Sequence, residues 1–166
     1  FDYATLRKNR EAYIDRARSS YDGSFKRNGV DLIEGRAEFV DAHTIRVNGE
    51  LIHAKHIVIA TGAHPHIPSI PGAELGGSSD DVFAWEELPE SVAILGAGYI
   101  AVELAGVLHT LGVQTDLFVR RERPLRGFDS YIVESLVQEM ENTGLNLHTH
   151  KVPVKLEETE QGITIH

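Results

Sequence analysis

Residues 91–126 read SVAILGAGYIAVELAGVLHTLGVQTDLFVRRERPLR, and this stretch decides the fold that we expect. It opens with a short apolar run, Ser91–Leu95, which is typical of a fully buried parallel strand. A glycine turn leads into a stretch whose apolar residues recur at helical spacing: Ile100, Leu104, Val107, Leu108 and Leu111. Gly112 ends this helix, and residues 115–119 read as the next strand. The order strand, turn, helix, strand predicts a Rossmann-like βαβ unit and an α/β fold.

The glycine turn has the pattern G-x-G-x-x-A, formed by Gly96, Gly98 and Ala101. Gly96 allows a tight turn, and Gly98 lets a pyrophosphate approach the backbone at the helix N-terminus, where free N–H groups and the helix dipole favour anions. Ala101 is small enough for the helix to pack closely on the strand. The pattern with its flanking strand and helix predicts a dinucleotide site, with Gly96, Ala97 and Gly98 at its centre.

A group of arginines follows the second strand, where NAD-binding units usually carry an acidic residue for the ribose 2′-hydroxyl. Arg120 and Arg121 occupy this place, and Arg123 and Arg126 follow closely. Guanidinium groups bind phosphate through charge-assisted hydrogen bonds, so the sequence favours NADPH over NADH. The alternative is a solvated basic turn that binds no ligand.

The composition limits the classes of partner. The 166 residues carry a formal net charge of −9, which argues against nucleic acid or an anionic membrane as partner. No secretory leader and no apolar run near the roughly 18 residues of a membrane span is present, so we expect a soluble, cytoplasmic protein. The absence of cysteine excludes disulfides, thiol catalysis and cysteine-based metal sites within this sequence. Both ends look cut, since the chain begins with Phe1 and stops inside a strand-like run.

The N-terminal part predicts a long helix followed by strands. Residues 1–27 have apolar residues at helical spacing, among them Tyr13 and Tyr21, and the pattern alone places these two tyrosines in the core or at its rim. Residues 38–40, 43–47 and 50–52 predict a small antiparallel meander with a hairpin turn at Asn48-Gly49. Two further apolar runs, residues 30–34 and 55–60, also read as strands.

A proline-rich connection precedes the βαβ unit and marks the expected domain boundary. Residues 64–72 contain three prolines, residues 76–81 read as a loop, and residues 82–88 predict a short helical turn. We therefore expect one domain over residues 1–89 and a second over residues 90–166. The second continues with a helix from Phe128, a strand over 145–150 and the start of a β-meander over 151–158 and 162–166.

These motifs together resemble the glutathione reductase branch of the flavoprotein disulfide reductases. The resemblance rests on IATG at residues 59–62, IPG at 70–72, GAGYIAVELAG at 96–106 and FVRRERPLRGFD at 118–129, and it covers essentially the whole chain. Dihydrolipoamide dehydrogenases are similar but usually have an acidic residue where Arg120 stands. Trypanothione reductases share LRGFD but usually carry an insertion before the second strand, for which residues 107–113 leave no room.

The resemblance implies a FAD domain with a small β-meander, followed by an NADPH domain, and it implies roles for individual residues. Tyr99 would cover the nicotinamide face of the flavin, Glu103 would pair with a lysine outside this chain, and Ile100 would line the NADPH site. Arg120 and Arg126 would bind the 2′-phosphate, with Arg121 beside them. Tyr13 and Tyr21 would lie on the helix face that touches glutathione disulfide. FAD would contact Gly35, Arg36, Ala37, Ala60, Thr61, Gly62, Ser79 and Asp80.

The residues alone leave other interpretations open. Glu103 could be an ordinary surface glutamate, and Tyr99 could pack at the turn. The pairs His64-x-His66 and His148-x-His150 lack carboxylates or cysteines at ligand spacing, so we expect no metal.

The expected parent is a homodimeric NADPH-dependent disulfide reductase acting on glutathione disulfide. Its CxxxxC motif and its catalytic histidine are absent here, so the chain reads as an internal fragment that is inactive alone. The alternative is a stand-alone NADPH-binding module without turnover.

Overall fold

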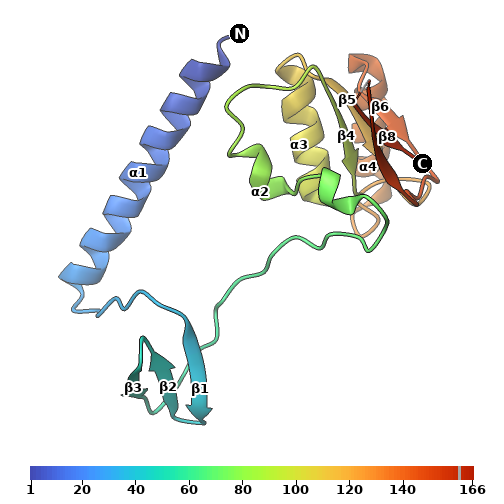
Figure 1. The fold of residues 1–166 in the computed structure, drawn as a ribbon. Helices are drawn as coiled ribbons and strands as arrows, with labels where there is room; N and C mark the ends of the chain where they lie inside the picture. The colour runs from blue at the N-terminus through green and yellow to red at the C-terminus, as the bar shows by residue number, and fades with distance from the viewer. Residues whose placement is uncertain (161) are drawn as a thin grey trace. The chain divides into compact units, whose positions relative to one another are not determined.

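The computed structural model describes residues 1–160 and 162–166, and it has the expected mixed α/β architecture (Figure 1). By its internal contacts the chain divides into two compact units, Asp2–His64 and Pro65–His166. No helix among the described residues combines the length and the apolarity that a bilayer crossing requires.

The first unit begins with α1, Tyr3–Arg27, which confirms the expected long helix (Figure 1). Asp2 caps its start, because the side chain accepts a hydrogen bond from the Thr5 N–H at 3.2 Å. Basic Lys26 and Arg27 in the last turn complement the negative end of the helix dipole. The helix has no buried residue, and Tyr13 and Tyr21 are 67% and 66% exposed. The pattern alone placed the two tyrosines in a core or at its rim, and their placement in a core is wrong for this structure.

The antiparallel meander is confirmed as β1, Ala37–Asp41, β2, Thr44–Val47, and β3, Glu50–His53. The hairpin between β2 and β3 turns at Asn48 and Gly49, whose φ angles are +52° and +87°. Positive φ at both central positions is what a type I′ turn demands, and the Asn-Gly dipeptide adopts it readily.

Two expected strands, residues 30–34 and 55–60, are wrong. Both segments lie outside the strands, and neither pairs with another strand among the described residues. Val58 is 86% exposed and Ile59 is 69% exposed. Their apolar composition favours a strand, but a strand forms only where a neighbour supplies backbone hydrogen bonds.

The second unit starts with the connection, which contains a 3₁₀ turn η1, Ala73–Leu75, and a short helix α2, Ser79–Val82. The helical turn was expected later, over residues 82–88. It forms earlier because Ser78 and Asp81 make a reciprocal capping box, in which the side chain of each residue accepts a hydrogen bond from the backbone N–H of the other. The connection packs against the rest of the unit, since the Leu156 N–H donates to the Pro71 carbonyl at 2.8 Å.

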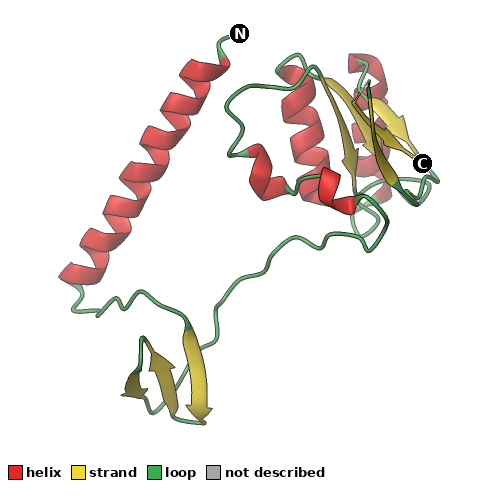
Figure 2. Ribbon diagram, in the orientation of Figure 1, coloured by secondary structure: helices red, strands yellow, loops and turns green. Residues whose placement is uncertain are grey.

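The parallel sheet of this unit has the order β4, Ser91–Leu95, β5, Gln114–Phe118, and β6, Asn146–His148 (Figure 2). Its register pairs Leu95 with Phe118 and Phe118 with His148. Two helices connect the strands, α3, Tyr99–Thr110, and α4, Ser130–Thr143. An antiparallel pair follows, β7, Leu156–Thr159, and β8, Gly162–Ile165. This pair confirms the expected start of a meander, but its first strand begins at Leu156 and not at Lys151. The strand expected over 145–150 is shorter and ends at His148.

The core lies between the sheet and its helices. Leu117 of β5 and Val119, which directly follows this strand, pack with Ala105 of α3 and Met140 of α4. Leu145 belongs to the same cluster. Both helices therefore cover one face of β5. The expectation that β4 is fully buried is wrong: it is an edge strand of the described sheet, and Leu95 on its second face is 37% exposed.

By its contacts, the connection belongs to the same unit as the parallel sheet, so the boundary between the two units lies at residues 64–65. The sequence predicted a domain boundary near residue 89. Contacts within one chain define compact units rather than the domains of a family, so the assignment of residues 1–89 and 90–166 to two domains stays a prediction.

Candidate nucleotide-binding site

The glycine turn joins β4 to α3 at the carboxyl edge of the parallel sheet. The Gly96 N–H donates to the Phe118 carbonyl at 3.1 Å, so the turn starts as a continuation of the sheet. A Cβ on Gly96 would lie only 3.1 Å from the Cβ of Ala101, which explains why both positions are small. The close helix–strand packing predicted for Ala101 is thereby confirmed.

The N-terminus of α3 is open to an anion. Gly98 is the N-cap residue and provides no side-chain hydrogen bond, so the first N–H groups of the helix lack a side-chain cap. A Cβ on Gly98 would meet no atom within 4 Å, which leaves free space directly at these groups. Uncapped N–H groups and the helix dipole attract negative charge. The turn therefore fits a pyrophosphate.

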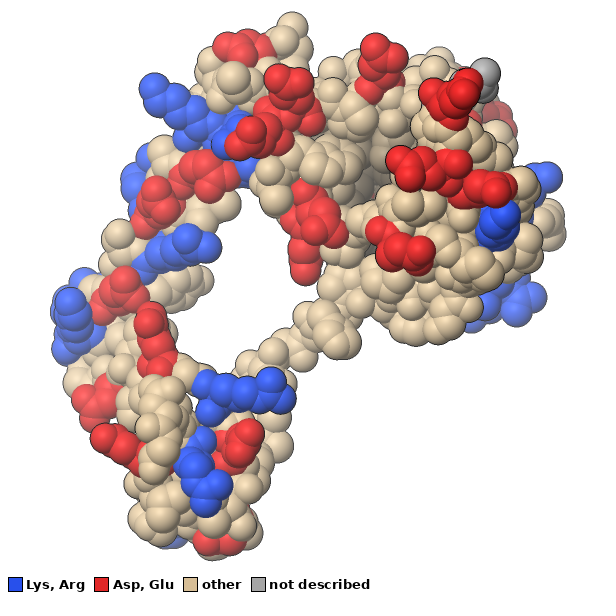
Figure 3. Space-filling model, in the orientation of Figure 1, with Lys and Arg blue, Asp and Glu red and all other residues tan. Residues whose placement is uncertain are grey.

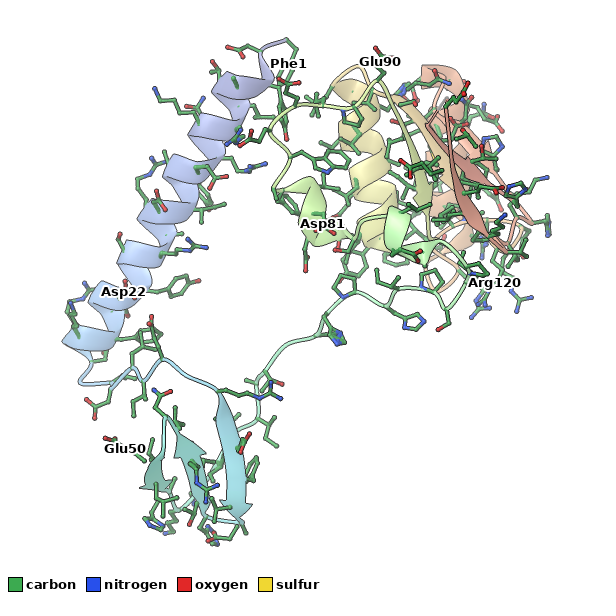
Figure 4. The ribbon with its side chains drawn as sticks, in the orientation of Figure 1. Phe1, Asp22, Glu50, Asp81, Glu90 and Arg120 are labelled. Carbon is green, nitrogen blue, oxygen red and sulfur yellow. The ribbon has the colours of Figure 1, made fainter. Side chains whose placement is uncertain are left out.

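The arginines lie on the loop that leaves β5 and runs to α4. Arg120, Arg121 and Arg126 are exposed, and Arg123 is half-buried. Figure 4 shows Arg120 at the lower margin of the unit, where several nitrogen-tipped side chains project outward. Figure 3 shows Lys and Arg side chains gathered at the same margin, while Asp and Glu side chains spread over the face toward the viewer. The loop thus carries a local positive charge on an acidic chain.

One backbone hydrogen bond joins the arginine loop to the glycine turn. The Leu125 N–H donates to the Ala97 carbonyl at 2.8 Å, and the Phe128 N–H donates to the Leu125 carbonyl at 2.9 Å. Pro124, beside Leu125, is fully buried and anchors the loop. The structure therefore brings together the two elements that the sequence predicted as one site, the turn for a pyrophosphate and the arginines for a phosphate.

Three residues with expected roles toward NADPH or the flavin lie on the first turns of α3. Tyr99 is 59% exposed and Ile100 is 46% exposed, and Glu103 is exposed one turn further along. Tyr99 is thus largely exposed within the described chain, and its role toward the flavin stays a prediction.

The residues expected at FAD are divided between the two units. Ala37 begins β1, and Gly35, Arg36 and residues 60–62 lie in loops of the first unit, whereas Ser79 and Asp80 lie in α2 of the second. A Cβ on Gly35 would lie 2.5 Å from the Asn48 side-chain oxygen, so the hairpin already fills the space beside this glycine. A Cβ on Gly62, whose φ is +71°, would meet no atom within 4 Å.

Hydrogen bonds alter the electrostatics next to Ser79 and Asp80. The Ser78 N–H and the Ser78 hydroxyl both donate to the Asp81 carboxylate, at 2.6 and 2.9 Å, and lower the pKa of Asp81 below the ordinary aspartate value. Asp81 is therefore an ionised capping residue of α2.

Sequence reasoning missed two residues that hold the arginine loop, Leu125 and His150. Both have left-handed backbone conformations, with φ of +50° and +56°. Histidine is enriched in this region of conformational space, so His150 carried a weak signal. Leucine is not, and no pattern in the sequence indicated the conformation of Leu125.

Comparison with known proteins identifies the family. A model of the pyridine nucleotide-disulphide oxidoreductase family matches residues 2–166. The chain belongs to this family. The match spans the glycine turn, the arginine loop and the whole first unit, and it confirms the resemblance seen in the sequence.

Named relatives refine this placement. The chain is 41% identical over 162 residues to a glutathione reductase of Schizosaccharomyces pombe and 39% identical over 161 residues to a chloroplastic/mitochondrial glutathione reductase of Pisum sativum. These alignments cover 93% and 97% of this chain but only 35% and 29% of the relatives. The chain thus spans about a third of the length of the curated relatives that it matches.

Solved structures show the same fold. A Cu(II) complex of the HOCl-induced flavoprotein disulfide reductase RclA from Escherichia coli matches with a TM-score of 0.91 at 25% identity, covering 100% of this chain and 39% of that chain. A second structure of RclA matches with a TM-score of 0.90 at 24% identity.

Proposed function

We propose that this chain is the NADPH-binding part, together with part of the FAD-binding part, of a glutathione-disulfide reductase. The observation that carries the proposal is the hydrogen bond from Leu125 to Ala97, which fastens four arginine-bearing loop positions to an uncapped glycine turn. The family and the two glutathione reductase relatives support the substrate, glutathione disulfide, and the cofactors NADPH and FAD. The absence of an acidic residue at position 120 and the names of these relatives favour this branch over dihydrolipoamide dehydrogenase and trypanothione reductase.

The residues of the second unit supply binding and orientation. The N–H groups at the start of α3 would hold the pyrophosphate of NADPH, and Arg120 and Arg126 would hold its 2′-phosphate, with Arg121 beside them. Tyr99 would cover the place where the nicotinamide enters, and Ile100 would line it. When bound, NADPH supplies hydride and FAD passes the electrons on to a redox disulfide.

Other residues have proposed roles toward the flavin and the substrate. Glu103, exposed on α3, would pair with a lysine beside the flavin. Tyr13 and Tyr21, both exposed on α1, would contact glutathione disulfide. Gly35–Ala37, Ala60–Gly62 and Ser79-Asp80 would contact FAD. Because the 166 residues contain no cysteine, the redox thiols of the reaction would come from outside them. Homodimerisation and a cytoplasmic location stay predictions from the resemblance and the composition.

The nucleotide preference of the purified 166-residue chain tests the proposal. Calorimetric titration with NADPH and NADH is compared for the wild type and for Arg120→Ala/Arg126→Ala. A hydrogen bond to a charged group contributes roughly 1.5–3 kcal/mol, so we expect the wild type to prefer NADPH at least about tenfold and the double variant to lose this preference.

The matched control is Arg16→Ala/Arg18→Ala on α1, which removes the same charge from the unit that does not carry the arginine loop. It should keep the preference of the wild type for NADPH. Equal affinity of the wild-type chain for NADPH and NADH would contradict the proposed function.

A further inference from the structure

The arginine loop is fastened on two sides by backbone hydrogen bonds. On one side the Leu125 N–H donates to the Ala97 carbonyl of the glycine turn at 2.8 Å. On the other side the chain after β6 runs beside the start of the loop: the His150 N–H donates to the Arg121 carbonyl, and the Lys151 N–H donates to the Val119 carbonyl, both at 3.1 Å. The segment that carries Arg120, Arg121 and Arg126 is therefore held at both ends.

On each side, one of the donors has an unusual backbone conformation. Leu125 has φ +50° and His150 has φ +56°, both in the left-handed region. Asn48 of the hairpin is the third described residue other than glycine with positive φ. The conformation of Asn48 is required by its type I′ turn, but Leu125 and His150 lie outside any hairpin.

A leucine persists in this conformation only where its surroundings hold it there, and such residues cluster at functional sites. Here the Leu125 N–H donates to the glycine turn, and the buried ring of Pro124 lies directly before it. The left-handed φ of Leu125 sets the direction in which the chain continues from this hydrogen bond. The conformation thus has a consequence at the site: it fixes where the loop, and with it Arg126, lies relative to the uncapped N-terminus of α3.

We propose that Leu125 and His150 are positioning residues, whose left-handed backbone holds the arginine loop at the distance from the glycine turn that lets one ligand reach both. The inference rests on the proposed NADPH site. It adds that the selectivity for a 2′-phosphate depends on backbone geometry as well as on the guanidinium groups. Neither side chain needs to touch the nucleotide.

Three substitutions at Leu125 in the 166-residue chain separate the backbone from the side chain. Leu125→Gly removes the side chain and Leu125→Asn replaces it with a polar one, and both residues tolerate positive φ. Leu125→Val keeps an apolar side chain, but its β-branch disfavours positive φ. We expect Leu125→Val to raise the dissociation constant for NADPH about tenfold, which corresponds to about 1.4 kcal/mol. The dissociation constant for NADH should stay within about threefold of the wild-type value. Leu125→Gly and Leu125→Asn should keep the NADPH preference of the wild type within about threefold. At the other end of the arginine loop, His150→Val is compared with His150→Asn in the same way.

Hydrogen exchange in the nucleotide-free chain gives a second, independent measurement. The Leu125 amide should be protected in the wild type and in Leu125→Asn, and it should exchange at least about tenfold faster in Leu125→Val. An unchanged NADPH preference in Leu125→Val, an equal loss of NADPH and NADH affinity, or an equal loss in Leu125→Gly would each overturn the proposal. A wild-type chain that does not prefer NADPH would count against the proposed function instead, and the exchange of the Leu125 amide would still decide whether the loop is held in this way.

Discussion

The imidazole of His148 has two partners on the neighbouring strand: its Nε2 lies 2.6 Å from Asp116 Oδ1, and its ring stacks on Phe118 with centroids 4.4 Å apart and planes 11° apart. All three side chains lie on the face of the parallel sheet that α3 and α4 leave uncovered, opposite the buried Leu117. The sequence presented this histidine as one half of a His-x-His pair. The structure shows it as a cross-strand contact that ties β6 to β5.

The first prediction concerns this contact. Asp116→Ala should destabilise the chain by about 0.5–1.5 kcal/mol, because it removes the acceptor of a half-buried hydrogen bond. A double-mutant cycle with His148→Ala, measured by urea unfolding, isolates the pair. A coupling free energy near zero would show that the contact does not stabilise the sheet.

The second prediction concerns Gly72. Its φ is +78°, and a Cβ on it would lie 2.0 Å from the Leu156 carbonyl oxygen, which is backbone and cannot move aside cheaply. Gly72→Ala should therefore lower the free energy of unfolding by roughly 2–4 kcal/mol. Gly144→Ala is the matched control in the same unit: its φ is +83°, but no atom lies within 4 Å, so it should cost only about 1 kcal/mol. Equal losses in thermal or urea unfolding would mean that strain at positive φ, and not the contact with Leu156, explains Gly72.

The third prediction concerns Ala101. Ala101→Val adds two methyl groups where the Gly96 backbone is already close, so α3 must shift from the turn, at about 1–3 kcal/mol. The shift displaces the N–H groups at Gly98, and the affinity for NADPH and for NADH should fall together by about tenfold or more, measured by calorimetry. In the control, Ala101→Gly, stability falls by about 1 kcal/mol through helix propensity while both affinities stay near those of the wild type. If Ala101→Val bound both nucleotides normally, close packing at this position would not matter for the site.

The fourth prediction concerns the pH dependence of α2. The hydrogen bonds from Ser78 lower the pKa of Asp81 in the folded chain, so ionised Asp81 stabilises the capping box. A carboxylate with a depressed folded pKa stabilises the fold above its unfolded pKa, about 3.9, and this contribution is lost as the pH falls through the folded value. The Ser78 amide resonance should therefore titrate below about pH 4, and Asp81→Asn should abolish this titration. The control is Asp80→Asn. Among the described hydrogen bonds, Asp80 bonds Ser78 through its backbone N–H and not through its carboxylate, so this variant should keep the titration of the Ser78 amide.

Local patterns predicted the elements whose signals lie close together in the chain. The 3.6-residue period between Tyr99 and Thr110 and the Asn48-Gly49 turn each depend on neighbours within a few residues, and both were confirmed. Residues 30–34 and 55–60 were mispredicted for the opposite reason: their apolar character is local, but strand formation requires a partner elsewhere, and none of the described strands pairs with them.

The candidate site shows the same division. The sequence by itself determined the glycine turn and the basic loop. The turn requires small residues, which are Gly96, Gly98 and Ala101. The positive charge of the loop follows from its composition alone, with Arg120, Arg121 and Arg126. Only the tertiary structure decided how the turn and the loop are joined. That outcome depends on a hydrogen bond between residues 28 positions apart, Ala97 and Leu125, and on a left-handed leucine that no local preference predicts. The physical reason is that packing around Pro124 and the parallel register of β4, β5 and β6 hold the loop in place and outweigh the intrinsic preference of Leu125.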